Sequence, residues 1–370
     1  AQQARLMLGG NEVPAQVQLT ARWPDGSVKW LLVTFLADAP ASAAAEYRLD
    51  YGPAVRPAAR LDGLHVERDA DGVRISTGAI RLRIDRQGRV ADVAQAARRP
   101  LSDRAGTVAE DPQGKTYHPA DGSLTIEESG PIRAVVKSVA PLRDAKGGHL
   151  ARIEQRIEAY GGLPWIRVHH TLVVDGPDRF TALKRLSYRL PVAGRGPWTV
   201  PLDDGKSLQL GETDADVYQL FDDAVSADPA GQRSRKGRVV GNFLGNAESD
   251  CAVAVRDFWQ NYPKAFRVSG DAVQLDLCPE FPEGIYDKFP FEKEGHHLYY
   301  YLLGGRYRLR QGMSKTHELL LAFSPPAERE AVARLFQRPL LATAPAEVYC
   351  RSRAFYDVAP RNPQRFKLYE

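Results

Sequence analysis

The feature that most constrains the fold is an alternation of apolar and polar residues with a period of two, interrupted by Gly, Pro and Asp. It appears at residues 73–76 and 80–84, on either side of Thr77-Gly78. Similar runs follow at 124–127, 132–139, 149–158, 165–174, 183–190, 237–243, 252–257, 272–277, 298–303 and 314–323. Many short strands at regular spacing are typical of an antiparallel β-sandwich and argue against a βαβ fold.

The length and the interruptions of this pattern indicate more than one domain. A chain of 370 residues is too long for one small core. Segments rich in Ala and Pro near residue 60 predict a small β domain over residues 1–60 and a large sandwich over 61–325. A helix is expected at 326–336, with acidic residues early and Arg334 late, and the rest of 326–370 is expected to be a connector.

Composition excludes several classes of protein. Hydrophobic residues make up 43% of the chain and charged residues 26%, which is typical of a globular protein. Since 50 basic residues nearly balance 46 acidic ones, and no basic run is interleaved with aromatic residues, we expect no nucleic-acid partner. No apolar run is long enough for a membrane span. The three cysteines include no Cys-x-x-Cys pair, so the usual zinc spacing is excluded and a disulfide framework is not indicated.

A tight turn between two tryptophans marks the N-terminal domain. Residues 22–30 read RWPDGSVKW, and the Pro-Asp-Gly inside them is a turn signal with a physical basis in each residue. Strand-like runs at 17–21 and 28–35 flank the turn, which predicts a hairpin with Trp23 and Trp30 on either side. Indole rings held near a turn either pack at the edge of a core or stack on a sugar.

A second aromatic segment, DFWQNYPK at residues 257–264, follows a predicted strand. It is too polar for a core and carries two large rings, Trp259 and Tyr262, together with Lys264. Exposed loops of this kind bind a ligand or hold one domain against another.

Two groups of histidines are candidates for chemistry. His169 and His170 lie next to each other on a predicted strand, so one should face the core and the other should face outward. A structural role is the commoner outcome for such a pair. The segment 286–317 is denser in His, Tyr, Lys and Arg, the side chains that general acid–base catalysis uses. A solvated hairpin whose tyrosines cover the sheet is an equally good interpretation of this segment.

Several separated motifs together resemble one family. They lie at residues 16–30, 128–133, 165–170, 257–264 and 312–317. In this order they resemble the exo-acting rhamnogalacturonan lyases and their bacterial relatives. The resemblance implies a mainly β fold, with a small RIFT-like β-barrel followed by a large antiparallel β-sandwich and a short helical C-terminal segment. It also implies that the opening strand of the barrel and the α/α toroid of the family are missing from this chain.

The resemblance implies β-elimination on a uronic acid. A cation neutralises the C6 carboxylate, a base removes H5, and an acid protonates the departing O4. By residue type and local density, we expect His296 or His297 as base, Tyr300 as acid, and Arg306 or Lys288 as the neutralising cation. The expected substrate-binding residues are Trp259 and Tyr262 as stacking rings, Lys264 near a substrate carboxylate, and Tyr286.

Two other functions remain open at the level of sequence. A non-catalytic carbohydrate-binding or scaffold module would keep the aromatic rings and make the histidines structural. A glycoside hydrolase would need two facing carboxylates, for which residues 257–294 offer several acids. For this chain we expect an acidic polysaccharide or oligosaccharide as partner, together with a C-terminal α/α toroid domain, no cofactor and no metal, and a secreted or periplasmic location.

Overall fold

The computed structural model describes residues 3–40, 43–192, 196–211, 215–245, 251–270, 272–286, 301–365 and 367. The chain forms two compact units, one of residues 1–60 with 338–370 and one of residues 61–337. The expected mainly β fold is confirmed, because strands dominate both units and the described residues contain two helices.

The first unit contains a three-stranded sheet, a hairpin and a short helix. The sheet pairs β1 (Ala4–Leu8) with β2 (Asn11–Val13) and β5 (Tyr47–Tyr51), and the hairpin pairs β3 (Ala15–Arg22) with β4 (Val28–Phe35). The helix is α2 (Ala346–Ser352). At the hairpin turn Gly26 has a φ of +83°, and the backbone N–H of Ser27 donates to Asp25 Oδ1 at 2.9 Å. The expected Pro-Asp-Gly turn is therefore confirmed, with the glycine where a positive φ is required.

The C-terminal segment packs against this hairpin. The ring of Trp30 meets the ring of Phe355 edge-on, with centroids 4.9 Å apart. Lys29 Nζ lies 4.4 Å from the ring centroid of Trp23 and 5.4 Å from that of Tyr356. The segment 326–370 is thus divided, because residues 326–337 belong to the second unit while residues 338–370 belong to the first.

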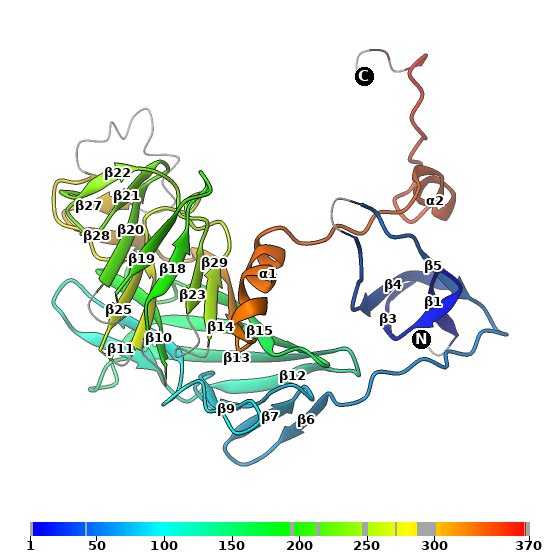
Figure 1. Ribbon diagram of the computed structural model, residues 1–370, viewed down its shortest axis with the longest axis horizontal. Coiled ribbons are helices and arrows are strands. Elements are labelled where there is room, and N and C mark those ends of the chain that lie inside the picture. The colour runs from blue at the N-terminus through cyan, green and yellow to red at the C-terminus, as the bar shows by residue number, and fades with distance from the viewer. Residues whose placement is uncertain are drawn as a thin grey trace. The chain divides into compact units, whose positions relative to one another are not determined.

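The second unit is built on seventeen strands that form one continuous antiparallel sheet folded into two layers (Figure 1). Layer A contains, in pairing order, β12 (Ser123–Ser129), β13 (Arg133–Arg143), β14 (His149–Tyr160), β15 (Trp165–Val173), β29 (Ser314–Ala322), β24 (Ala252–Val255), β23 (Asn242–Gly245), β18 (Trp198–Pro201) and β19 (Ser207–Leu210). Layer B contains β11 (Thr116–Pro119), β10 (Gly106–Glu110), β17 (Arg185–Pro191), β26 (Ala272–Cys278), β25 (Lys264–Ser269), β20 (Ala215–Phe221), β21 (Ala224–Ser226) and β22 (Ser234–Lys236). Strand β11 pairs with both β10 and β13, and so joins the layers.

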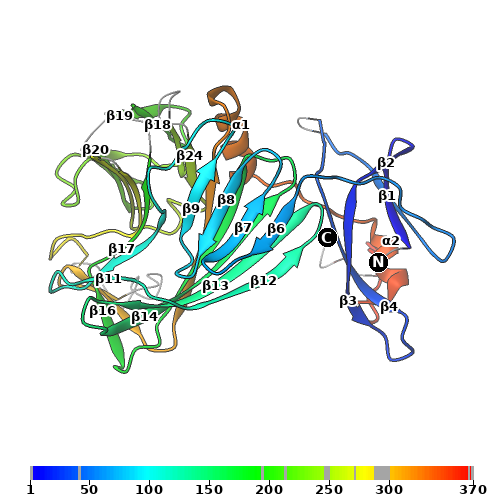
Figure 2. The ribbon, with the colours of Figure 1, turned by 90° about the horizontal axis from the view of Figure 1, so that it is seen from below.

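Smaller elements complete this unit. A four-stranded sheet contains β6 (His65–Arg68), β7 (Gly72–Ser76), β8 (Arg81–Asp85) and β9 (Val90–Ala94). It lies against the long strands of layer A, as Figure 2 shows, and Gln155 Nε2 of β14 donates to the carbonyl of Gly88 at 3.1 Å. A three-stranded sheet contains β16 (Phe180–Leu183), β28 (Arg306–Arg310) and β27 (Tyr301–Leu303), and the helix is α1 (Pro326–Gln337). The expected helix at 326–336 is therefore confirmed.

The core lies between the two layers. Phe243 of layer A stacks on Phe266 of layer B with ring centroids 3.8 Å apart, and Trp198 lies 5.4 Å from the same ring. The apolar residues of the alternating pattern fill this space, whereas α1 packs Phe336 on the other face of layer A, with Leu320. The sandwich thus has a core face and an outer face on layer A, and the polar residues of the pattern lie on the outer one.

His169 and His170 confirm the expected opposition of neighbours on a strand. His170 is buried and its Nε2 lies 2.8 Å from Thr107 Oγ1 of layer B, whereas His169 is on the outer face. His317 of β29 pairs with His170 across the strands and is also buried. Burial lowers the pKa of His170 to about 4. Burial, together with the charge of Lys264, also lowers the pKa of His317.

These buried histidines predict a pH-dependent stability. The pKa of His170 is lower in the folded chain than its ordinary value of 6.5, so the unfolded chain binds the proton more readily. Stability should therefore fall as the pH falls from about 6.5 toward 4, and His170 alone should cost about 2 kcal/mol between pH 7 and pH 5. Urea unfolding at these two pH values measures the loss, which should be smaller by about this amount in His170→Gln. An equal loss in the variant would contradict the assignment.

Candidate functional site

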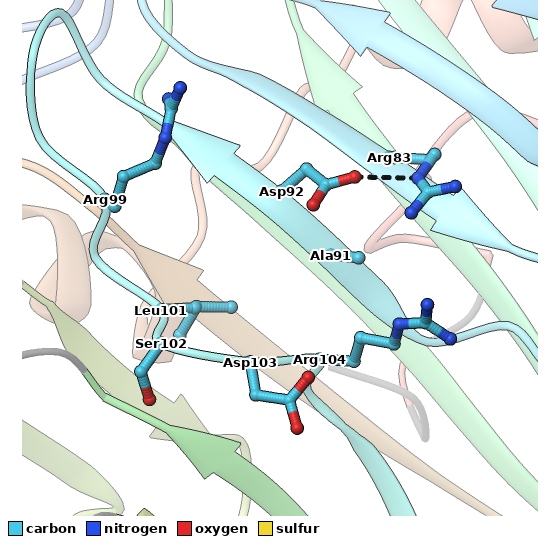
Figure 3. Close-up of a pocket in the computed structure, with 8 residues that line it drawn as sticks. All are labelled: Arg83, Ala91, Asp92, Arg99, Leu101, Ser102, Asp103 and Arg104. Carbon is cyan, nitrogen blue, oxygen red and sulfur yellow. Dashed lines mark hydrogen bonds and ion pairs between the residues drawn. The ribbon is translucent and has the colours of Figure 1, made fainter.

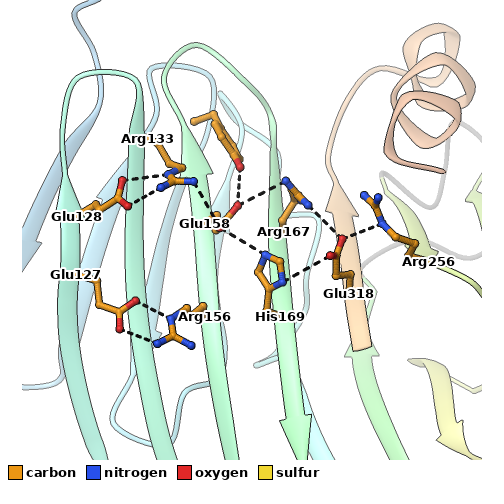
Figure 4. Close-up of polar contacts among 10 residues, drawn as sticks. Glu127, Glu128, Arg133, Arg156, Glu158, Arg167, His169, Arg256 and Glu318 are labelled. Atoms are coloured by element: carbon orange, nitrogen blue, oxygen red, sulfur yellow. Dashed lines mark hydrogen bonds and ion pairs between the residues drawn. The ribbon is translucent and has the colours of Figure 1, made fainter. Parts of the chain in front are cut away.

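The outer face of layer A carries a dense array of charged side chains. The alternation in β14 and β15 places Glu158, Tyr160, Arg167 and His169 on this face, while the residues between them point into the core. The register sets Glu158 opposite Arg167 across the two strands. Figure 4 shows Glu158, Arg167 and His169 beside other side chains from β12, β13 and β29. We call the residues joined by their contacts the Glu158 cluster, which comprises Glu128, Arg133, Glu158, Tyr160, Arg167, His169, Arg256 and Glu318.

Glu158 is the centre of this cluster. The hydroxyl of Tyr160 donates to Glu158 Oε2 at 2.5 Å, and His169 Nε2 lies 3.4 Å from Oε1. The guanidinium groups of Arg133 and Arg167 lie 3.9 Å and 3.7 Å from the same carboxylate. One carboxylate therefore orients a phenol and an imidazole and has two cations beside it.

A second carboxylate, Glu318 of β29, lies on the other side of the histidine. His169 Nδ1 is 3.9 Å from Glu318 Oε1, and Arg167 donates to Glu318 Oε2 at 3.1 Å. Arg256, which follows β24, lies 2.8 Å from the same oxygen and its guanidinium lies 4.7 Å from the ring centroid of Phe336 in α1. The imidazole is thus held between two carboxylates that come from different strands.

The protonation states within the cluster follow from these contacts. Burial by itself would raise the pKa of Glu158, but the hydrogen bonds from His169 and Tyr160 and the charge of Arg167 lower this pKa to about 2. Burial and the charge of Glu158 raise the pKa of Tyr160 to about 12. At neutral pH the carboxylate is therefore ionised and the phenol carries its proton.

This arrangement can transfer protons next to a bound anion. The side chain of His169 is 28% exposed and that of Arg167 is also 28% exposed, whereas that of Glu158 is only 11% exposed. A ligand on this face can reach the imidazole and the guanidinium, while Glu158 stays beneath them as the group that holds them. An imidazole, a protonated phenol and arginines are the side-chain types that acid–base catalysis on an acidic sugar requires.

The aromatic segment after β24 is only partly available to a ligand. Trp259 is half-buried, and the guanidinium of Arg238 lies 4.5 Å from its ring centroid. Tyr262 is also half-buried, with its ring 6.2 Å from that of Phe221. Their expected role as stacking rings stays a prediction.

Two of the expected substrate-binding residues lie in the core, which corrects the prediction for them. Lys264 is 1% exposed, and its Nζ donates to the carbonyls of Asn261 at 2.9 Å and Leu277 at 2.8 Å. Tyr286 is fully buried, and its hydroxyl donates to the carbonyl of Leu220 at 2.7 Å. Both polar groups are bonded to backbone carbonyls inside the protein, so neither faces a substrate in this structure.

The expected catalytic residues are mostly outside the described residues. This applies to His296, His297, Tyr300 and Lys288. Arg306 is described and lies exposed on β28. The catalytic roles of all five therefore stay predictions.

The Glu158 cluster was not predicted as a site, although four of its members lie in motifs that carry the family resemblance, namely Glu128, Arg133, Arg167 and His169. The adjacent histidines drew attention to β15, and the polar positions of β14 and β15 alternate visibly in the sequence. What the sequence lacks is the pairing that brings Glu318 next to His169, since these residues are far apart along the chain. A search for charged residues on alternate positions of neighbouring strands would have found half of the cluster.

Neither a metal site nor a membrane helix is seen in the part of the chain that the structure describes. Within it, no group of three or more His, Cys, Asp or Glu side chains is placed to hold a metal ion. The helices described there are too short and too polar to cross a membrane.

Comparison with known families identifies both units. Residues 1–51 match the PcRGLX-like N-terminal RIFT barrel domain, and residues 64–196 match the PcRGLX-like protein central β-sandwich domain. The chain belongs to the PcRGLX-like family. This confirms the expected resemblance. Most residues of the Glu158 cluster lie on strands within the matched sandwich domain of this PcRGLX-like protein. The domains are those of a family of carbohydrate-active enzymes.

Several solved structures are similar to this chain at low sequence identity. An α-mannosidase from Enterococcus faecalis V583 is 11% identical, with a TM-score of 0.54, and the match covers 92% of this chain and 40% of that one. A glycosyl hydrolase family 38 protein from Enterococcus faecalis is 12% identical, with a TM-score of 0.49, over 92% and 41%. A putative aldose 1-epimerase from Escherichia coli K12 is 12% identical, with a TM-score of 0.36, over 70% and 99%. A search of curated protein sequences gives no significant match.

Proposed function

We propose that this PcRGLX-like protein cleaves a uronic-acid-containing polysaccharide of the rhamnogalacturonan type by β-elimination. The observation that carries the proposal is the Glu158 cluster, in which Tyr160, His169 and two arginines meet on the outer face of layer A. The acidic polysaccharide as partner and a secreted or periplasmic location are parts of the same proposal.

The chemistry assigns a role to each group. Arg133 and Arg167 neutralise the C6 carboxylate of the uronate, which makes H5 more acidic. His169 takes H5, the electrons of the broken C–H bond form the C4=C5 double bond, and the C4–O4 bond breaks. Tyr160, which keeps its proton at neutral pH because its pKa is about 12, donates that proton to the departing O4. Glu158 stays ionised and orients the phenol and the imidazole.

Product chemistry tests this proposal. The chain is incubated with rhamnogalacturonan and with other uronate polysaccharides, and the ultraviolet absorbance of the unsaturated uronyl product is followed. β-Elimination gives a rise in absorbance, whereas hydrolysis gives saturated sugars and no rise. The chain spans 40% of the α-mannosidase that it matches, so a version extended by an α/α toroid is measured in parallel. Saturated products from both versions would overturn the proposal.

One observation favours a second candidate, which is saccharide binding without catalysis. Every charged side chain of the Glu158 cluster already contacts a partner of opposite charge within the protein. Such a cluster can form a rigid polar surface for a sugar without taking part in a reaction. Retained saccharide binding with no product of either kind from both versions would support this candidate.

A further inference from the structure

A hollow on the second unit lies on the outer side of the β6–β9 sheet, and Figure 3 shows it. Its volume is about 620 Å³, within the range of small-molecule sites. Arg83 of β8 and Asp92 of β9 line it together with Arg99, Asp103 and Arg104 from the loop that follows β9. A neighbouring cavity of about 350 Å³ shares Arg83 and Asp92, so the two form one groove across the sheet.

The groove is lined mainly by charged side chains. Its apolar lining residues, Ala91, Leu101, Ile75 and Leu82, are buried, and the last three belong to the core beneath the sheet. The charged side chains that line the two cavities are five arginines and three carboxylates, Arg74, Arg81, Arg83, Arg99 and Arg104 with Glu67, Asp92 and Asp103. An excess of guanidinium groups in the groove suits a sugar ring that bears a carboxylate.

The arginines differ in how firmly the protein holds them. Arg83 Nε lies 2.8 Å from Asp92 Oδ2, and Asp92 sits at a bulge with a φ of +54° that places it beside this arginine. Arg104 Nη1 lies 3.4 Å from Asp85 Oδ2. Arg89 Nε lies closer to the same oxygen, at 2.8 Å. Neither Arg81 nor Arg99 has an ion pair or side-chain hydrogen bond among the described residues. Arg81, Arg99 and the loosely held Arg104 are therefore the cations with the most capacity left for a ligand.

The groove is separate from the Glu158 cluster. The β6–β9 sheet packs its inner side against the core face of layer A, and the cluster lies on the opposite, outer face of that layer. A ligand in the groove therefore cannot contact His169 or Tyr160. Two sites on opposite sides of one sandwich suit a long chain, since binding at one site raises the local concentration of the polymer at the other.

We propose that this groove is a second, non-catalytic binding site for the uronate residues of an acidic polysaccharide. The proposal rests on the proposed function for its choice of polymer and adds a separate surface to it. A neutral saccharide lacks the carboxylates that the arginines recognise and should bind much more weakly.

Isothermal titration with an oligogalacturonate at low salt tests the proposal, with the carboxyl-reduced, neutral oligomer as comparison. In Arg99→Gln/Arg104→Gln we expect the affinity for the oligogalacturonate to fall about tenfold or more. The matched control is Arg235→Gln/Lys236→Gln on the exposed strand β22, which removes the same charge and should bind as the wild type does. Circular dichroism shows whether each variant is folded.

The outcomes separate the groove from the proposed function. His169→Ala, on the opposite face, should leave the arginine-dependent binding unchanged. If that binding is present but no unsaturated product forms from polysaccharide, the proposed binding site in the groove is supported and the lyase proposal fails. Three outcomes would each overturn the proposed binding site. They are equal affinity of the wild type and the Arg99→Gln/Arg104→Gln variant for the oligogalacturonate, equal affinity of the wild type for the neutral oligomer, and no binding by the wild type.

Discussion

Replacing Tyr160 by Phe should slow the formation of unsaturated product by roughly 10²–10⁴-fold, because the variant loses the proton donor for O4. The phenol is 2.5 Å from Glu158, and its pKa of about 12 keeps it protonated at neutral pH. His169→Ala should give a loss of similar size, since it removes the base. Initial rates at saturating substrate, read from the ultraviolet absorbance, measure both effects.

The matched control for this experiment is Tyr117→Phe. Tyr117 of β11 is buried, and its hydroxyl also donates to a carboxylate, Asp111 Oδ2, at 2.9 Å. This variant loses the same kind of hydrogen bond away from the Glu158 cluster and should retain the wild-type rate. Undiminished rates in both Tyr160→Phe and His169→Ala would show that the cluster does not catalyse the reaction. The expected catalytic residues at 288–306 would then be the next to test.

Replacing Glu158 by Gln should lower the free energy of unfolding by about 2–3 kcal/mol, because it leaves Arg133, Arg167 and His169 without their shared counter-charge. For a unit of this size the loss corresponds to a decrease in Tm of roughly 3–5 °C. Calorimetry at neutral pH measures it. Glu158 has a pKa of about 2 in the folded chain against an ordinary 4.5, so its contribution is complete above about pH 4.5 and is lost as the pH falls toward 2. The difference between wild type and variant should therefore shrink at acidic pH.

Glu127→Gln is the control for this second prediction. Glu127 is a neighbour of Glu128 on β12 and contacts Arg156 at 2.7 Å, but the two side chains are 30% and 48% exposed. Exposed pairs contribute about 0–1 kcal/mol, so the Tm of this variant should change little. If Glu127→Gln and Glu158→Gln lowered the Tm equally, the Glu158 cluster would contribute no more to the stability of layer A than an exposed ion pair does.

The sequence alone was enough for much of the fold. The period-two alternation predicted the strands, the Pro-Asp-Gly turn predicted the β3–β4 hairpin, and residues 326–336 predicted α1. Each of these signals is local, because a strand, a turn or a helix is encoded within a few residues. The opposite orientation of His169 and His170 was predictable for the same reason.

The candidate site was harder to predict, because it depends on which strands are neighbours. Glu318 lies next to His169 only because β29 pairs with β15. The local sequence of neither strand predicts this pairing. Lys264, in contrast, was predicted as a substrate-binding residue but lies in the core. Its charge suggested a surface position, but two carbonyls satisfy its ammonium inside the protein, and burial lowers its pKa to about 8.

The place of β29 in layer A has a consequence for synthesis of the protein on the ribosome. Strand β29 pairs with β15 on one side and β24 on the other, so it fills the middle of the layer although it follows every other described strand of the layer in the sequence. A nascent chain that has emerged only as far as residue 313 therefore leaves the edges of β15 and β24 open at once. Such edges readily pair with other chains, so the growing polypeptide is most prone to aggregate in the interval before residues 314–322 emerge.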